Sequence, residues 1–113
     1  MHKPSPAIIL LTLVLMAGCT TAKQSFGNPI PSFEQKSVKD LFSTAIPQSM
    51  VVMVEGRITT ECPAGCWFYL DDGTGSVYVT LPDFIIPQIA GSRVRVYGFF
   101  WNDTITGERV EVI

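Results

Sequence analysis

Hydrophobic and polar residues alternate through most of the chain after residue 50, as they do in β-strands with one buried face. Turn-rich segments separate the alternating runs, and Gly56 and Gly98 interrupt two of them, where a bulge or a sharp coil is expected. Residues 82–91 contain two prolines, which predict an irregular crossing or a single helical turn. The pattern as a whole predicts five strands, over residues 50–61, 66–71, 76–81, 92–101 and 108–113.

The residues before the strands predict three further segments. Residues 7–17 are apolar apart from one threonine, whereas residues 20–36 are polar, contain two prolines and show no sustained period. Ser37 fits the N-cap of a short helix over residues 37–42, because Asp40 follows it three positions later in a variant of the capping box. We therefore predict a signal peptide (1–18), a flexible tether (19–36) and one folded domain (37–113).

The number of strands and their internal glycines predict an all-β fold, a small five-stranded OB-fold barrel with a short N-terminal helix. Closing the sheet also removes the exposed strand edges that promote aggregation. Strand alternation divides the side chains of such a barrel into an inward and an outward set. The inward set, the predicted core, comprises Phe68, Leu70, Val77, Val79, Leu81, Val94, Val96, Val110 and Val112. The outward set comprises Trp67, Tyr69, Tyr78, Thr80, Arg93, Arg95 and Tyr97, while Gly98 leaves the side of residues 99–101 open.

The N-terminal segment resembles a bacterial lipoprotein signal peptide. Lys3 supplies a positive start, two small residues precede Cys19, and the apolar run is shorter than the 17–25 residues or so of a membrane-spanning helix. The resemblance implies that Cys19 is lipidated and becomes the first mature residue, and that Thr20 directs a Gram-negative protein to the outer membrane, facing the periplasm. An ordinary secretory peptide with an incidental cysteine is the alternative. The tether would hold the domain at most about 60 Å from the lipid.

Composition excludes several kinds of chemistry. The 113 residues suit one domain, and losing Lys3 with the signal peptide leaves seven basic and ten acidic residues. The only histidine, His2, is lost as well, so the mature chain has no Ser-His-Asp or Cys-His catalysis and no His-bearing zinc site. The carboxylates are scattered and suggest no acid pair. We therefore predict a binding protein that is not an enzyme and needs no cofactor, and the acidic balance argues against a generic nucleic-acid binder.

Cys62 and Cys66 bracket a Pro-Ala-Gly loop between the first two predicted strands. Facing positions of a hairpin lie at a Cα distance that suits a disulfide, so we predict that these cysteines form one in an oxidising compartment and fix the loop. A redox role is less favoured, because thioredoxin-like pairs have two intervening residues. Two thiolates without histidine leave a zinc site incomplete. Residues 71–75 lack the downstream glutamate of a calcium loop and are typical of a turn, so no metal site is predicted.

Four runs of residues resemble the bacterial OB-fold (BOF) family of exported proteins. They are Val52-x-Val54-x-Gly56-x-Ile58, the run WFYLDDGTGSVYV at 67–79, Gly91-x-x-Val94-x-Val96-x-Gly98, and Val110-x-Val112. The resemblance covers residues 37–113, although the central phrase is shared more widely among OB-folds. It implies ligand binding and envelope stress tolerance rather than catalysis. The chain differs from this family in its lipoprotein-type signal and in the insertion at Cys62–Cys66.

Aromatic side chains of the outward set indicate where a ligand would bind. Trp67 and Tyr69 on the second predicted strand adjoin Tyr78 on the third if these strands pair through the turn between them, and Arg57 and Arg95 are expected to flank the rings. Contiguous exposed apolar surface usually marks a contact site. OB-folds bind oligonucleotides and oligosaccharides on this face. The alternative is that Trp67 and Tyr97 cover the barrel end or pack beneath the helix.

Taken together, these observations predict a monomeric, lipid-anchored module of the cell envelope. Its membrane contact is the lipid on Cys19, and its ligand is an envelope protein, a glycan or a small amphipathic molecule. A nucleic-acid-binding OB domain is the first alternative, and a thiol or metal carrier in envelope biogenesis is the second.

Overall fold

A computed structural model describes residues 24–113, and the predicted signal peptide and Cys19 lie outside them. The described elements are β1 (Ser25–Gly27), β2 (Glu34–Gln35), α2 (Val38–Ser43), β3 (Val51–Glu61), β4 (Trp67–Asp71), β5 (Ser76–Thr80), β6 (Arg93–Trp101) and β7 (Thr104–Val112). The five predicted strands are confirmed as β3 to β7. Their ends agree within one residue except at the start of β7, and residues 82–91 form the predicted irregular crossing. No described helix is long and apolar enough to cross a membrane.

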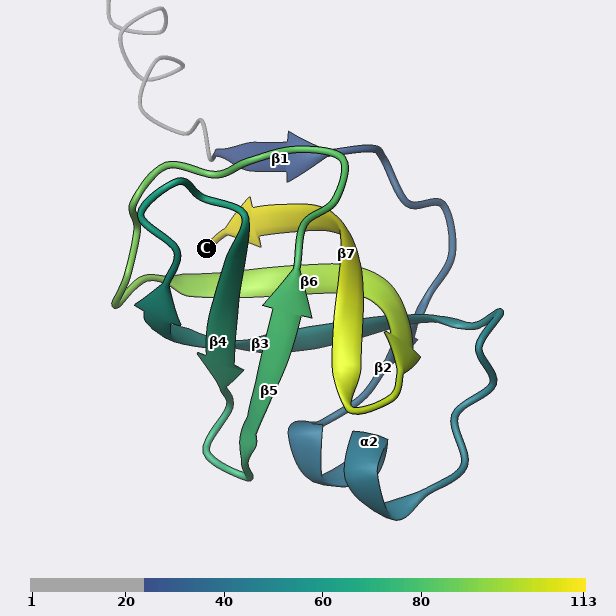
Figure 1. Ribbon diagram of the computed structural model, residues 1–113. Coiled ribbons are helices and arrows are strands. Elements are labelled where there is room, and N and C mark those ends of the chain that lie inside the picture. The colour runs from purple at the N-terminus through teal and green to yellow at the C-terminus, as the bar shows by residue number, and fades with distance from the viewer. Residues whose placement is uncertain (1–23) are drawn as a thin grey trace, which may run out of the picture.

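Strands β3 to β7 form a closed ring (Figure 1). β3 pairs with β4, β4 with β5, β6 with β7 and β6 with β3, all antiparallel, and the parallel pair β5 and β7 completes the barrel. The five-stranded closure matches the prediction. The barrel is an OB-fold.

The hairpin of β6 and β7 accounts for the early start of β7. Asn102 and Asp103 have φ angles of 53° and 62°, and Trp101 lies opposite Thr104, so only these two residues form the turn. Two positive φ angles are those of a type I′ turn, whose twist suits paired strands. The strands predicted over 92–101 and 108–113 leave a six-residue connection at 102–107, which the structure shortens to these two residues.

Gly98 lets β6 and β7 approach each other closely. A Cβ atom at this position would collide with the carbonyl oxygen of Thr106, and the register of the two strands shifts between Tyr97 and Gly98. The irregularity expected at Gly98 is therefore confirmed. On β3 the corresponding irregularity lies at Thr59, three residues beyond Gly56, where the pairing with β4 shifts.

The inward side chains form one core, as predicted. Eight of the nine predicted core residues are buried, and Val112 is half-buried at the edge. Helix α2 closes one end of the barrel with Val38 and Leu41, each only 2% exposed (Figure 1). The Oγ atom of Ser37 accepts a hydrogen bond from the backbone N–H of Asp40, which confirms Ser37 as the N-cap.

Residues 24–36 pack on the barrel instead of extending away from it. β1 pairs with β7 at residues 109–111, and β2 pairs with β3 at Val52 and Met53. Residues 109–111 of β7 have no other strand on that edge, because β5 pairs with β7 only at residues 104–106. Val52 and Met53 of β3 have none either, because β4 pairs with β3 only from Arg57 onward. The described part of the predicted tether is therefore a strap that covers two open edges of the sheet.

Candidate ligand-binding face

Three aromatic side chains meet on the outer face of β4 and β5, and we call Trp67, Tyr69 and Tyr78 the aromatic cluster. Tyr69 lies directly opposite Tyr78, and their ring centroids are 5.3 Å apart. The Trp67 ring is 6.1 Å from Tyr69 and 5.9 Å from Tyr78. These separations are those of interacting aromatic pairs. The cluster predicted from the sequence is therefore assembled, with Tyr69 42% exposed and the other two rings half-buried.

Alternation along two short strands positions these rings. Phe68 and Leu70 on β4, and Val77 and Val79 on β5, are at most 1% exposed and occupy the core. Their neighbours must therefore point outward, because successive side chains of a strand lie on opposite faces. The rings are held by a rigid sheet rather than by a loop, which lowers the entropy lost when a ligand is bound.

Trp101 extends the aromatic surface across two further strands. It is 63% exposed at the end of β6, it lies opposite Thr104 of β7, and Thr104 in turn lies opposite Tyr78. Tyr69, Tyr78, Thr104 and Trp101 therefore form one row across four strands, which we call the aromatic row. Alternation alone leaves the side of Trp101 open, because Gly98 can shift the register. The signal that identifies it is the Asn102-Asp103 turn, because a two-residue turn fixes Trp101 and Thr104 as a pair on one face.

The two arginines expected to flank the cluster lie in different surroundings. Arg57 is opposite Asp71, next to the cluster, but its guanidinium donates a 2.7 Å hydrogen bond to the carbonyl oxygen of Gly91. Arg95 lies on β6 between Glu55 of β3 and Glu111 of β7, and it pairs with both carboxylates. The prediction that Arg95 flanks the cluster is wrong, because β3 lies between β4 and β6.

An ion network occupies the outer face of β3, β6 and β7. Glu55 pairs with Arg93 and Arg95, and Glu111 pairs with Arg95 and Arg109. The hydrogen bond from Arg93 holds the pKa of Glu55 below its ordinary value. Burial raises the pKa of Glu111, but hydrogen bonds from Arg109 and Tyr97 outweigh it and lower the pKa overall. These cations are therefore neutralised by neighbouring carboxylates rather than directed at the aromatic row.

Tyr97 belongs to this network and not to the exposed rings. It is only 7% exposed, its hydroxyl donates to Glu111 at 2.8 Å, and Phe33 of the strap packs edge-on at 4.9 Å from its ring. Burial, followed by the Glu111 carboxylate, raises the pKa of Tyr97. The alternative prediction, that the Tyr97 ring is packed rather than exposed, is therefore correct. The segment that packs on it is the N-terminal strap and not helix α2.

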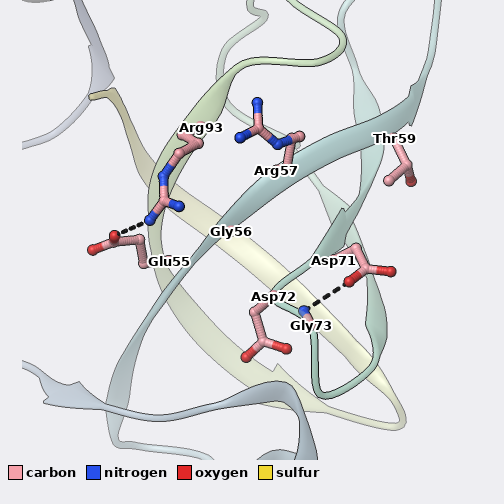
Figure 2. Close-up of a pocket in the computed structure, with 8 residues that line it drawn as sticks. All are labelled: Glu55, Gly56, Arg57, Thr59, Asp71, Asp72, Gly73 and Arg93. Atoms are coloured by element: carbon pink, nitrogen blue, oxygen red, sulfur yellow. Dashed lines mark hydrogen bonds and ion pairs between the residues drawn. The ribbon is translucent and has the colours of Figure 1, made fainter.

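A polar groove of about 330 Å³ lies beside the cluster, between β3 and the β4–β5 turn (Figure 2). Arg57 and Arg93 line one side, and Asp71 and Asp72 line the other. Both aspartates hold the turn: Asp71 accepts from the backbone of Gly73, and Asp72 accepts from the backbone and hydroxyl of Thr74. Among residues 24–113, no group of three or more His, Cys, Asp or Glu side chains is arranged to hold a metal ion.

Cys62 and Cys66 lie at the end of the cluster, in the loop between β3 and β4. The structure holds them as half-exposed thiols whose sulfur atoms are 2.9 Å apart, with Cys66 placed to donate to Cys62. That hydrogen bond lowers the pKa of Cys62 and raises that of Cys66. The predicted disulfide stays a prediction.

No family model matches the chain, and no curated protein matches it. Among solved structures, it is similar to a putative aspartyl-tRNA synthetase from Leishmania major Friedlin, with a TM-score of 0.57 and 16% identity over 89% of this chain and 25% of that one. Apo TiaS, a tRNAIle2 agmatidine synthetase, matches with a TM-score of 0.45 and 23% identity over 65% of this chain and 20% of that one. The chain thus spans a quarter or less of these structures. The similarity to the putative aspartyl-tRNA synthetase bears on the fold alone. The resemblance to the BOF family stays a prediction.

Proposed function

We propose that the chain is a non-catalytic binding module of the cell envelope, anchored by lipid at Cys19, and that the aromatic row is its ligand-binding face. The observation that carries the binding role is the aromatic cluster, which gathers three rings on the outside of β4 and β5 while the core is filled without them. Such a patch on a small domain is typical of a contact site. The anchor rests on the lipoprotein-type sequence that ends at Cys19.

The chemistry around the row favours an uncharged, ring-containing ligand, and we propose a neutral oligosaccharide. The row itself consists of aromatic and hydroxyl side chains, and Thr80 and Thr106 add two more hydroxyls beside it, at positions that alternate with core residues. Flat rings stack on the apolar faces of sugars, and hydroxyls satisfy the polar edges. The row crosses four strands at about 4.8 Å each, so it suits a ligand of several linked rings.

Charge argues against the nucleic-acid alternative. The four arginines of the chain are bonded to Gly91, Glu55 or Glu111, and the two described lysines lie in or just before α2 rather than on the strands of the row. Asp71 lies two residues after Tyr69 on β4, and Asp103 lies in the turn between Trp101 and Thr104. A phosphate backbone would therefore meet carboxylates, where single-strand-binding proteins supply a positive groove.

Titration of the exported protein with uncharged oligosaccharides of two to six units tests this proposal, with binding followed by calorimetry. Trp67→Ala and Tyr78→Ala should each weaken binding about tenfold, which corresponds to about 1.4 kcal/mol, and change the melting temperature by only a few degrees. Phe33→Ala is the control, because it removes an exposed aromatic ring (43%) that belongs to the strap and not to the row. It should leave binding unchanged.

Three results would contradict the proposal in different ways. If none of the oligosaccharides binds, the ligand class is wrong. Binding of a single-stranded oligonucleotide that weakens steeply with salt would favour the nucleic-acid alternative, because phosphate contacts release counterions. Collapse of the melting temperature in Trp67→Ala and Tyr78→Ala would show that these rings stabilise the domain instead of serving as a site.

A further inference from the structure

We infer that Cys62 and Cys66 are a reversible dithiol–disulfide pair that cross-links the β3–β4 loop directly before Trp67. The two sulfur atoms already face each other at 2.9 Å, across a loop of three residues. A disulfide has a sulfur–sulfur distance of about 2.05 Å, so closing the bond requires a relative movement of less than about 1 Å. Both thiols are half-exposed and accessible to an oxidant.

The backbone of the loop is already held in the shape that the bond would lock. The N–H of Cys62 donates to the carbonyl of Trp67, and the N–H of Gly65 donates to the carbonyl of Cys62, both at 2.9 Å. Gly65 has a φ of +79°, and a Cβ atom there would collide with the carbonyl oxygen of Ile86. Hydrogen bonds and a glycine therefore determine the shape of the turn. They bring the two cysteines together before any disulfide forms.

The same loop is joined to the crossing that follows β5. The carbonyl of Cys66 accepts from the N–H of Leu81 at 2.9 Å, and the carbonyl of Gly65 accepts from Ile86 at 3.1 Å. The carboxylate of Glu61, at the end of β3, accepts from the N–H of Ile89 at 2.8 Å. A clasp between residues 62 and 66 therefore stabilises the end of the barrel at which the aromatic cluster begins.

Oxidation proceeds by thiol–disulfide exchange with a more oxidising protein disulfide. The Cys62 thiolate attacks one sulfur of that disulfide and releases the other as a thiolate, and the Cys66 thiolate then attacks Cys62 and displaces the remaining sulfur. The oxidant gains two electrons and takes up the two protons that leave Cys62 and Cys66. The hydrogen bond from Cys66 lowers the pKa of Cys62 and so favours its thiolate. Both thiols are half-exposed, and the same two steps with the cysteines exchanged give the same disulfide.

Trp67 is the residue that senses the clasp. It follows Cys66 directly, its carbonyl closes the hairpin with Cys62, and its ring contacts Tyr69 and Tyr78. Opening the bond returns the pair to two thiols, and the loop then keeps its shape through its backbone hydrogen bonds alone. The surroundings of the Trp67 ring should therefore change while the rest of the barrel is maintained. Trp101 lies in the other strand pair, at the β6–β7 turn, and should not respond.

The experiment uses the full chain exported from a bacterial host and needs no ligand, so its outcome is independent of the proposed function. Differential alkylation with peptide mapping measures the state of Cys62 and Cys66 after equilibration with reduced and oxidised glutathione. Trp101→Phe leaves Trp67 as the sole fluorescent tryptophan, and Trp67→Phe is the matched control that leaves Trp101. Thermal unfolding of wild type and of the Cys62→Ser, Cys66→Ser double variant measures stability.

We expect a 62–66 disulfide in the exported protein that reduction converts to two alkylatable thiols, with a fall in melting temperature of about 10 °C. The emission of Trp67 should change on reduction in Trp101→Phe, and the emission of Trp101 should stay constant in Trp67→Phe. The double variant should match reduced wild type and ignore reductant. Free thiols at both positions after equilibration with oxidised glutathione would overturn the inference, as would a disulfide whose reduction leaves the emission of Trp67 unchanged.

Discussion

Replacing Asp72 by alanine should loosen helix α2 from the barrel and lower the stability of the domain. One oxygen of the Asp72 carboxylate accepts from the N–H of Val38 at 2.9 Å, and the other accepts from the N–H and the hydroxyl of Thr74 at 2.9 and 2.6 Å. The Thr74 hydroxyl oxygen in turn accepts from the N–H of Lys39. Asp72 thus satisfies the first turn of α2, directly and through Thr74, and keeps Val38 and Leu41 over the core.

The expected loss follows from these bonds. A hydrogen bond to a charged group contributes about 1.5–3 kcal/mol when buried. Asp72 is only half-buried, so we expect about 2 kcal/mol in total for Asp72→Ala. For a domain of this size, that corresponds to a fall in melting temperature of about 10 °C, measured by circular dichroism at pH 7. Asp71→Ala is the control, because Asp71 is exposed and accepts one bond, from Gly73.

The pH dependence gives a second test of the same carboxylate. Burial raises the pKa of Asp72, but the hydrogen bonds from Thr74 and Val38 outweigh it and lower the pKa overall. A lowered folded-state pKa stabilises the domain above the unfolded pKa of about 4, and the benefit is lost as pH falls through the folded value. The difference between wild type and Asp72→Ala should therefore shrink between pH 5 and pH 3. Equal stabilities of Asp71→Ala and Asp72→Ala at pH 7, or a difference that persists at low pH, would refute the reasoning.

Two further predictions concern the barrel and its anchor. Gly98→Ala should destabilise the domain by about 3 kcal/mol in denaturant unfolding, because the new Cβ meets the β7 backbone. Gly73→Ala has open space around it and should cost only about 1 kcal/mol, because of its positive φ. Equal losses of stability in the two variants would contradict this account. Cys19→Ser should abolish incorporation of a fatty-acid analogue in metabolic labelling and release the protein from the membrane fraction; equal labelling of wild type and variant would exclude lipidation at Cys19.

Alternation was enough to predict the barrel and its core, because a strand with one buried face places every second residue inside. Phe68, Leu70, Val77 and Val79 were assigned to the core on this basis, and all are buried. The start of β7 was missed because Thr104 and Thr106 are polar on both sides of Ile105, and a single buried residue between two threonines does not distinguish a strand from a loop. Cross-strand pairing decides such positions, and pairing is not visible in a local pattern.

The sequence predicted those contacts of the candidate site that join two strands adjacent along the chain. Tyr69 and Tyr78 meet because β4 and β5 are joined by a short turn, so their register follows from the sequence. Arg95 was misplaced because its position depends on which strand separates β4 from β6, a property of the whole barrel. Tyr97 was expected among the outward residues, and it does point outward, but the strap that covers it lies more than sixty residues earlier in the chain.

The strap also changes how a lipid anchor at Cys19 would position the domain. β1 and β2 are three and two residues long, too short to show alternation, and they form because β7 and β3 have open edges that accept them. Since the chain joins the barrel at Gln24, whose carbonyl accepts from Val112, only the five steps from Cys19 to Gln24 can extend. Their reach is at most roughly 17 Å, in place of the 60 Å or so of a free tether. A lipidated chain would therefore hold the β1 side of the barrel close to the bilayer, whereas the row crosses β7 at Thr104, at the other end of that strand.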